Sequence, residues 1–364
     1  MATGAADGVR DAHVVLVTDH FDADFEALTS QHGFRVDAIF PADAPTTAIV
    51  SAHGVRLRLE SSPTGRPLTL HLLTDARTGP HVLPGGSTLE YRPFTTDYVM
   101  PGGSPSLVIS HDTGESGVGR AGMRYRDLLP DRWGGTFVAS HITIPDGGPV
   151  PDYVHFHKVR FQVIFVKAGW VRLVYEDQGE PFVMVAGDCV LQPPQIRHRV
   201  LESSPGLEVI EIGTPALHDT IADWSLELPN GRGDAARDWS GQRFARHIAA
   251  EATYQEWRLP GWESRDTGIG EATDGLAGVR VARVATGSGE LAASDTEFAM
   301  MVVLRGEVTF ETDHDPGERL RDGSSVAIPG GVAYRLVDAT PDCELLDVTL
   351  PAVPLPAVPL PADV

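Results

Sequence analysis

Cysteine, basic residues and long apolar runs are all scarce in this chain of 364 residues. Its two cysteines, Cys189 and Cys343, are too few for a disulfide framework, and each stands in an apolar run where a thiol behaves as a small hydrophobic side chain. The chain has 29 basic and 50 acidic residues, and its formal net charge of −21 repels phosphate backbones and anionic lipid. We therefore expect no nucleic-acid partner and no membrane partner.

The sequence has no stretch of about eighteen apolar residues, the length needed to cross a membrane. Residues 1–8 also lack the charged segment and apolar run of a secretory signal, so a cytoplasmic location is expected. The chain is instead rich in glycine and proline, with 38 and 28 copies, and 42% of its residues are hydrophobic. This composition is typical of strands joined by tight turns, and the length allows two or three domains.

Three histidines from two separate segments are spaced as if they meet around one ion. His155 and His157 alternate within an apolar run, and in a strand both would point to the same face. Further along, a turn and a strand lead from Gly187 to Pro193, and His198 stands five residues beyond that proline. Neutral imidazole is a common ligand of divalent transition metals, so this spacing indicates a metal site.

This arrangement resembles the two-part signature of the cupin family, in which an H-x-H pair, a carboxylate five residues on, and a third histidine after G-x5-P bind a divalent metal inside a small β-barrel. The resemblance implies that His155, His157 and His198 are metal ligands. The sequence departs from the family at one position, because the usual glutamate is Gln162 here. Gln162 is then either a weak neutral ligand or a group that hydrogen-bonds a metal-bound water or oxygen species.

A site of three neutral imidazoles and one carboxamide leaves a divalent ion with its full charge, which favours an anionic or enolisable chelating substrate. Fe(II) is the first expectation for the metal, from redox-active relatives with three-histidine sites, and Ni, Mn, Zn and Cu remain open. Gln162, Tyr153 and Arg160 are the candidate catalytic residues. Tyr153 lies near the histidine pair, and Arg160 shares a strand face with Gln162 and could clamp a carboxylate. The alternative for Arg160 is a solvated place at the barrel rim.

The chain contains an internal repeat, which is its strongest organisational feature. The matching segments are 122–127 with 261–266, 161–169 with 298–306, and 187–193 with 323–329. They predict two tandem copies of one barrel at residues 120–223 and 259–350, and the cupin resemblance implies that the protein is a mainly β bicupin with two jelly-roll barrels. In the second copy, the four positions that match His155, His157, Gln162 and His198 are occupied by residues without an imidazole. These residues are Ala292, Ser294, Ala299 and Tyr334. The second barrel is therefore expected to hold no metal.

Residues 1–78 show a different pattern, with a strand at 13–17, a helix at 22–31 and three strands near 34–40, 46–51 and 55–60. This βαβββ order resembles one module of the vicinal-oxygen-chelate, or glyoxalase-like, fold. That family places metal ligands on its first strand and at the end of its fourth, which implies His13 and Glu60. The alternative is that His13 caps a strand and Glu60 faces water, because one module makes only half a site.

The remaining segments have no assigned chemistry. Residues 79–119 are rich in Gly, Pro and Thr and are expected to form an irregular connector. Residues 224–258 are expected to form a helical linker with a long helix at 234–256, and a short helix is expected just before the linker at 215–223. The proline-dense tail, 351–364, is expected to be extended.

Three functions are consistent with this sequence. The first is a mononuclear non-haem iron dioxygenase, or a related oxygenase, that acts on a small oxygenated organic molecule which chelates the metal. The second is a Lewis-acid isomerase, lyase or epimerase, which would need an acid–base partner that the metal motif does not supply. The third is a binding or sensory protein without turnover. The family resemblance also leaves a homodimer open.

Overall fold

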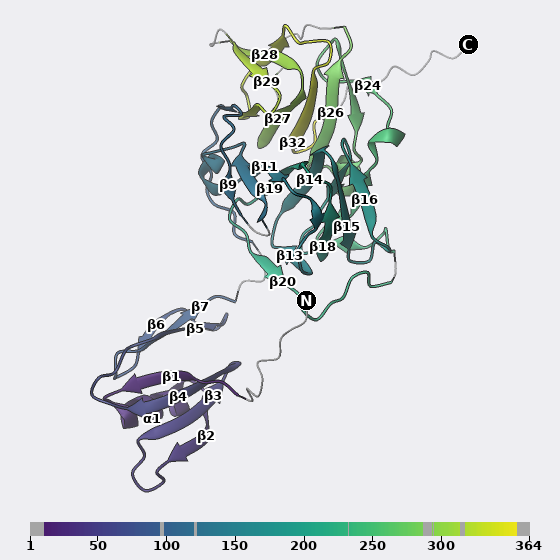
Figure 1. Ribbon diagram of the computed structural model, residues 1–364. Coiled ribbons are helices and arrows are strands. Elements are labelled where there is room, and N and C mark those ends of the chain that lie inside the picture. The colour runs from purple at the N-terminus through teal and green to yellow at the C-terminus, as the bar shows by residue number, and fades with distance from the viewer. Residues whose placement is uncertain are drawn as a thin grey trace. The chain divides into compact units, whose positions relative to one another are not determined.

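The computed structural model describes residues 11–94, 98–119, 122–231, 233–286, 293, 295–313 and 317–354 (Figure 1). The chain divides into two units, one that ends at residue 96 and one that begins at residue 97. Within the described residues, no helix is both long and apolar enough to cross a bilayer.

The N-terminal unit is built around a four-stranded sheet and one helix. Its elements are β1 (Val14–Thr18), α1 (Phe21–Gln31), β2 (Arg35–Phe40), β3 (Thr47–Ala52) and β4 (Val55–Ser61). The strand order is β1-β4-β3-β2, with β1 parallel to β4. The helix buries Phe21, Ala27 and Leu28 in a core that includes Leu16 and Leu57 from the strands. The predicted βαβββ order is confirmed.

A second, three-stranded sheet completes this unit. It consists of β5 (Thr69–Leu73), β6 (Gly79–Val82) and β7 (Thr88–Arg92), in the order β5-β7-β6. Leu72, Leu89 and Tyr91 from these strands pack into the same core as the first sheet. The expected module boundary at residue 78 and the irregular connector at 79–119 were therefore wrong here, because the glycines and prolines of this segment separate paired strands.

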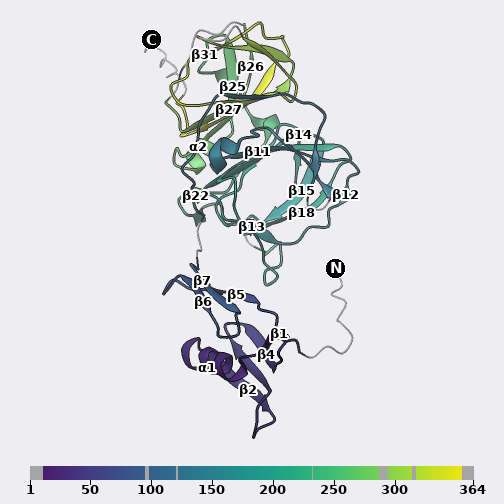
Figure 2. The ribbon, with the colours of Figure 1, turned by 90° about the vertical axis from the view of Figure 1, so that its left-hand side faces the viewer.

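The first barrel of the C-terminal unit is formed by two facing sheets (Figure 2). Its strands are β9 (Gly117–Val118), β10 (Arg124–Asp127), β11 (Val138–Ile144), β13 (His155–His157), β14 (Phe161–Ala168), β15 (Trp170–Tyr175), β16 (Phe182–Val185), β17 (Cys189–Leu191), β18 (His198–Ser203), β19 (Leu207–Thr214), β20 (Thr220–Ala222) and β23 (Ala245–His247). One sheet has the order β23-β17-β14-β19-β11-β10-β9, and the other has the order β16-β15-β18-β13-β20. Side chains from both sheets, such as Val209 and Val171, share one apolar core.

The second barrel has the same two-sheet construction. Its strands are β8 (Val108–Ser110), β24 (Gln255–Glu256), β25 (Trp262–Asp266), β26 (Gly278–Val284), β27 (Phe298–Arg305), β28 (Glu307–Thr312), β29 (Glu318–Arg321), β30 (Ser325–Ile328), β31 (Tyr334–Val337) and β32 (Glu344–Leu350). The sheet orders are β24-β25-β26-β32-β27-β30-β8 and β29-β28-β31. Strand β8 comes from the segment expected to be an irregular connector, and it pairs with β30 at the edge of this barrel.

The two barrels repeat the same strand pairing residue by residue. In the first barrel, Phe161 of β14 pairs with Thr214 of β19. In the second, Phe298 of β27 pairs with Leu350 of β32. Each pair of strands also contains a register shift near the end of the first strand. The prediction of two copies of one barrel is confirmed, and the shared register allows positions in the two barrels to be compared directly.

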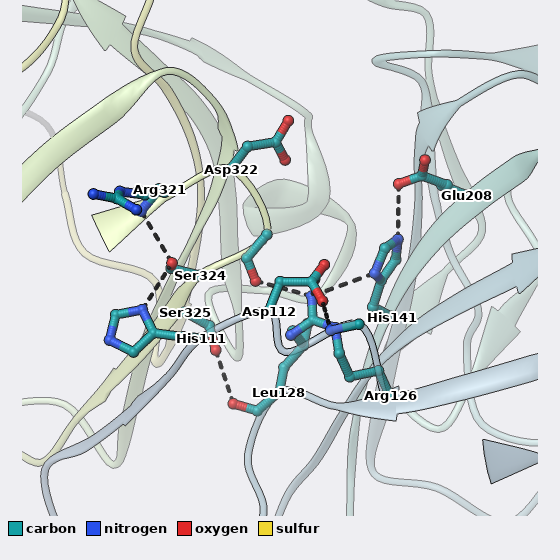
Figure 3. A network of polar contacts seen from close by, with 12 residues as sticks. His111, Asp112, Arg126, Leu128, His141, Glu208, Arg321, Asp322, Ser324 and Ser325 are labelled. Atoms are coloured by element: carbon teal, nitrogen blue, oxygen red, sulfur yellow. Dashed lines mark hydrogen bonds and ion pairs between the residues drawn. The ribbon is translucent and has the colours of Figure 1, made fainter. Parts of the chain in front are cut away.

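The barrels pack against each other through their larger sheets. Phe137 stacks on Phe298 in this shared core, with 4.0 Å between the ring centroids. A polar network lies in the same interface (Figure 3), where the Arg126 side chain donates a hydrogen bond of 2.9 Å to the carbonyl oxygen of Gly323. The apolar contact stabilises the pair of barrels, and the directional hydrogen bond fixes their mutual orientation.

Glu208 is an acidic member of this network (Figure 3). It accepts hydrogen bonds of 2.9 Å from the His141 ring and 2.9 Å from the Lys167 ammonium group. Lys167 also pairs with Asp322 of the second barrel at 3.0 Å. The hydrogen bond from His141 lowers the pKa of Glu208 from 4.5 to about 2, against the opposing effect of burial, and Lys167 adds to the lowering.

A carboxyl group with a lowered pKa stabilises the fold while it is ionised, so the contribution of Glu208 is present above its unfolded-state pKa and is lost as the pH falls to about 2. We therefore expect the melting temperature of the wild type to fall more steeply between pH 4.5 and pH 2 than that of Glu208→Gln. Scanning calorimetry measures both slopes. Glu202→Gln, at an exposed pair 3.8 Å from Arg172, is the control that should follow the wild type. Equal slopes for wild type and Glu208→Gln would contradict the prediction.

The two helices expected between the barrels were wrong. Segment 215–223 contains β20, which pairs with β13. Segment 234–256 contains β21 (Asp238–Trp239), β22 (Gln242–Arg243), β23 and a short 3-10 turn at Ala249–Glu251. Strands β13 and β17 each have an edge with unpaired backbone groups, and β20 and β23 supply the hydrogen-bond partners. This pairing outweighs a weak local preference for helix. Of the tail expected to be extended, residues 355–364 lie outside the described residues.

Candidate metal centre

The three predicted histidines come together in the interior of the first barrel. His155 on β13 stands opposite His198 on β18 in the strand register, and His157 follows two residues after His155 on the same face. The ring centroids of His155 and His198 are 4.3 Å apart, and His157 is 5.2 Å from each of them. One ring nitrogen from each residue lies within 4.8 Å of the other two. This spacing brings three imidazoles within reach of a single ion.

Each of these rings is oriented by a protein group at its Nδ1 atom. Nδ1 of His155 lies 2.8 Å from the carbonyl oxygen of Tyr153, and Nδ1 of His198 lies 3.1 Å from that of Ile196. Nδ1 of His157 lies 3.0 Å from the Thr220 hydroxyl. A carbonyl oxygen only accepts, so His155 and His198 carry their proton on Nδ1 and have their lone pair on Nε2. This is the support that metal-binding histidines usually have.

The histidines open onto a cavity of about 260 Å³ inside the barrel. Most of its wall is apolar, with Ile142, Leu173 and Val200 among the lining residues. The wall also carries polar groups, and Gln192 donates a hydrogen bond of 2.8 Å to the buried Tyr175 hydroxyl. Burial raises the pKa of Tyr175, so its hydroxyl stays protonated. The site is therefore a largely apolar chamber with a few fixed polar groups.

Gln162, which stands where the cupin signature has a glutamate, is buried and faces a carboxylate. Its side-chain nitrogen donates a hydrogen bond to Oε1 of Glu211 on the neighbouring strand β19. Its side-chain oxygen has no hydrogen-bond partner among the described residues. Gln162 is 1% exposed and is not among the residues that line the cavity. The observed partner of Gln162 is therefore Glu211, a contact that neither of its two expected roles included.

Glu211 itself lines the cavity, and the sequence analysis missed it. Its signal is a glutamate at an inward position of an apolar strand, Leu207–Thr214, where polar residues would normally point outward. In the shared register Glu211 pairs with Ile164, as Asp347 pairs with Met301 in the second barrel. An acidic residue therefore occupies the same interior position in both barrels.

A fourth histidine, His218, also lines the cavity. Its ring lies 5.5 Å from that of His157, and its Nδ1 atom is 2.8 Å from the carbonyl oxygen of Pro215. The sequence analysis did not identify His218, because it expected a helix at 215–223. The pairing of β20 with β13 is what brings this segment next to His157.

Tyr153 and Arg160, the other candidate catalytic residues, do not line the cavity. The Tyr153 ring packs edge-on against His155 at 5.7 Å, and its backbone oxygen orients that histidine. Arg160 forms an ion pair of 2.6 Å with Glu297. Tyr153 thus packs against the ring of His155, and Arg160, whose side chain is 26% exposed, is paired with Glu297 outside the cavity.

The second barrel has a different interior. Ala299 and Tyr334, two of the four positions matched to the ligands, are buried, and Ala292 and Ser294 lie outside the described residues. The Tyr334 hydroxyl accepts a hydrogen bond of 3.1 Å from Arg258, and Arg258 also donates one of 2.7 Å to Asp347. A guanidinium group thus occupies the interior beside the carboxylate that matches Glu211.

The two metal ligands implied for the N-terminal unit are not brought together. His13 lies 3.5 Å from Asp11, and Glu60 pairs with Arg58 at 2.6 Å. Among the described residues, the histidine, cysteine and carboxylate cluster with metal-ligand spacing is the one in the first barrel. The alternative, in which His13 and Glu60 are ordinary strand-end and surface residues, therefore holds.

Two solved structures are similar to this chain in fold. A putative glyoxylate-induced protein from Pseudomonas aeruginosa matches with a TM-score of 0.50 and 12% identity, over 78% of this chain and 100% of that chain. A point mutant of oxalate decarboxylase from Bacillus subtilis matches with a TM-score of 0.50 and 12% identity, over 71% of this chain and 80% of that chain. By fold, the chain is a bicupin.

Comparison by sequence assigns this bicupin to no family. No family model matches it, and the search of curated proteins finds no significant match. At 12% identity the two structures establish the fold alone, so the chemistry of the bicupin rests on its own cavity and on the residues that line it.

Proposed function

We propose that the first barrel is the mononuclear metal centre of a metal-dependent cupin enzyme that acts on a small oxygenated organic substrate. The observation that carries this proposal is the convergence of His155, His157 and His198 on a cavity of about 260 Å³. The hydrogen bonds at Nδ1 fix these rings and favour ligation through the opposite nitrogen. A largely apolar chamber with a few convergent polar groups is typical of a small-molecule site.

A divalent ion held by these histidines would supply a Lewis acid and, if redox-active, a binding place for dioxygen. The neutral imidazoles leave its positive charge uncompensated, which favours a substrate that chelates through an enolate, phenolate or carboxylate. Apolar side chains such as Ile142 and Leu173 exclude water from the chamber, and this strengthens the electrostatic contacts inside it. Glu211, on the same wall, is placed to hold or move a proton of the substrate.

The first candidate reaction is Fe(II)-dependent oxygenation, as in a dioxygenase. Its support is the all-nitrogen ligand set, which leaves positions and charge for a chelating substrate beside dioxygen. By its name, the decarboxylase that shares the fold acts on oxalate, a small chelating dianion. This supports the substrate class, a small molecule with neighbouring oxygen atoms.

The second candidate is a reaction without redox chemistry, an isomerase, lyase or epimerase in which the metal polarises a carbonyl group. Such a reaction needs a general acid or base, and the metal motif offers none. Glu211 supplies one, because it lines the same cavity and is held in place by Gln162. This contact is the specific observation that favours the second candidate.

Elemental analysis of the purified protein, combined with oxygen-uptake measurements, separates these candidates. Acetylacetone, salicylate and oxalate serve as chelating test compounds. Iron together with compound-dependent oxygen uptake supports the oxygenase. Zinc or manganese, with product formed and no oxygen consumed, supports the Lewis-acid enzyme. Tight binding without product indicates a binding or sensory protein and contradicts an enzymatic function.

Glu211→Gln tests the proton-transfer role. The variant keeps the size of the side chain and removes its charge, so turnover is expected to fall by about 100- to 10,000-fold, the usual range for loss of a general acid or base. Metal content should match the wild type, because the three histidines are unchanged. Initial rates with the fastest test compound and elemental analysis measure the two quantities. Glu202→Gln, on the outside of the same barrel, is the control. Loss of metal in Glu211→Gln would show that this carboxylate is a ligand instead.

A further inference from the structure

The N-terminal unit contains a large cavity of its own, with a volume of about 710 Å³. Its walls come from the residues after α1, the turn between β3 and β4, strand β5 with the loop that follows it, and β7. Leu70, Leu72 and Phe94 provide apolar surface along this wall. The cavity lies within one unit and shares no residue with the metal centre.

The polar part of the wall is basic. Arg77 and three histidines, His32, His53 and His71, line the cavity, and no acidic residue is among its described lining residues. Acidic residues outnumber basic ones by 50 to 29 in the chain as a whole, so this composition runs against the average. Glu90 lies outside the lining set and pairs with His71 at 3.1 Å. The Arg77 guanidinium thus faces no carboxylate among the described lining residues, which favours an anion beside it.

His32 has an unsatisfied donor at this wall. Arg77, which can only donate, lies with one side-chain nitrogen 3.3 Å from Nδ1 of His32, and the Tyr91 hydroxyl is 2.5 Å from the same atom. Nδ1 is therefore an acceptor, and the proton of the neutral ring is on Nε2. That atom is buried and has no hydrogen-bond partner among the described residues. Burial, with His81 and Arg77 adding to it, lowers the pKa of His32 to about 4, so the ring is neutral at pH 7.

Arg77 is held in a defined place beside this ring. Its guanidinium carbon lies 3.5 Å above the Tyr91 ring, and the bond to His32 is its one hydrogen bond among the described residues. The side chain is exposed, so most of its donors face outward. A planar guanidinium fixed by stacking is well suited to bind a carboxylate through two parallel hydrogen bonds.

The part of the wall next to His32 has a strained backbone conformation. His53, in the turn between β3 and β4, has a φ angle of 51°, in the left-handed region that favours glycine. Its ring donates a hydrogen bond of 3.1 Å to the carbonyl oxygen of His32. The turn thus places a second imidazole on the cavity at a cost in backbone strain, which proteins commonly retain at binding sites.

We propose that this cavity binds a small organic carboxylate with an apolar body, so that the chain has a second ligand site separate from the metal centre. The carboxylate pairs with the Arg77 guanidinium, and the apolar body packs against Leu70, Leu72 and Phe94. The volume suits a ring-containing acid of ordinary metabolite size.

Binding of 4-fluorobenzoate to the metal-free full chain, followed by fluorine NMR, tests the proposal. We expect saturable binding to the wild type and equal binding to His155→Ala, because the metal centre is not involved. Arg77→Met should weaken binding by about 10- to 100-fold through loss of the charge-assisted hydrogen bonds. 4-Fluorobenzyl alcohol, which has the same ring without the charge, should bind at least about 10-fold more weakly.

Two further variants keep the test decisive if Arg77→Met disturbs the fold. Ala76→Trp places an indole in the cavity at an exposed lining position and should block binding while the Arg77 contacts remain. Arg92→Met, on β7 but outside the lining set, is the matched control and should bind as the wild type does. Unchanged binding in both Arg77→Met and Ala76→Trp, equal binding of the alcohol, or no binding to the wild type would overturn the proposal. Binding that disappears in His155→Ala would assign the site to the metal barrel.

Discussion

Alanine in place of His155 is expected to leave the purified protein without metal. The ring is 1% exposed and stands 4.3 Å from that of His198, at the centre of the three-histidine cluster. Residues that merely support a ligand cost about 10- to 100-fold in metal affinity when changed, so loss of one of three direct ligands should cost more than about 100-fold. Elemental analysis after dialysis, and titration of metal into the metal-free protein, measure this loss.

The matched control is His20→Ala, which removes a solvent-exposed imidazole and should leave the metal content unchanged. Thr220→Val tests the support of His157 and should weaken metal binding by about 10- to 100-fold, because only the hydroxyl that holds Nδ1 is lost. If His155→Ala retained as much metal as His20→Ala, the three histidines would not form the site.

The part of the metal centre that the sequence predicted depends on local geometry. His155 and His157 share a strand face because side chains alternate along any strand, and this holds whatever the strand pairs with. The third histidine, His198, was predicted from its distance from Gly187 and Pro193, which match the turn residues of the cupin signature. The match between the strand registers of the two barrels was also predictable, because the chain contains two copies of one sequence pattern.

Glu211 was not predictable in this way, because its role follows from pairing between distant segments. It meets Gln162 only through the contact of β14 with β19, almost fifty residues further along the chain. A single glutamate in an apolar strand is more often exposed than functional. Both acidic residues are in the sequence, but the match between Glu211 and Asp347 can be recognised only when the register of both strand pairs is known.

The errors in secondary structure have a related cause. Segments 215–223 and 234–256 were expected to be helical from local pattern, and they pair instead with the strand edges of β13 and β17. Segment 79–119 was expected to be irregular, yet it supplies β6 and β7 to the N-terminal unit and β8 to the second barrel. Tertiary pairing overrides a weak local preference, and sequence reading does not show which edges are unfilled.

Arg258→Met is expected to destabilise the second barrel by about 3 to 5 kcal/mol, the usual cost of leaving a buried charge without its partner. Asp347 is 2% exposed and Arg258 is 11% exposed, and the two form an ion pair inside the barrel. Burial alone would lower the pKa of Arg258, but Asp347 and Tyr334 outweigh this effect and raise it, so the guanidinium stays charged. Without the guanidinium, Asp347 must be buried as a lone charge or take up a proton.

Urea unfolding followed by tryptophan fluorescence measures this effect, because Trp257 and Trp262 are buried in the core of the same barrel. The double variant Arg258→Met with Asp347→Leu should recover to within about 1 kcal/mol of the wild type, since an apolar pair of similar volume replaces the ion pair. Arg305→Met, which breaks a pair whose side chains are 71% and 50% exposed, is the control and should change stability by less than about 0.5 kcal/mol. A single Arg258→Met variant as stable as this control would show that the carboxylate matched to Glu211 needs no cation.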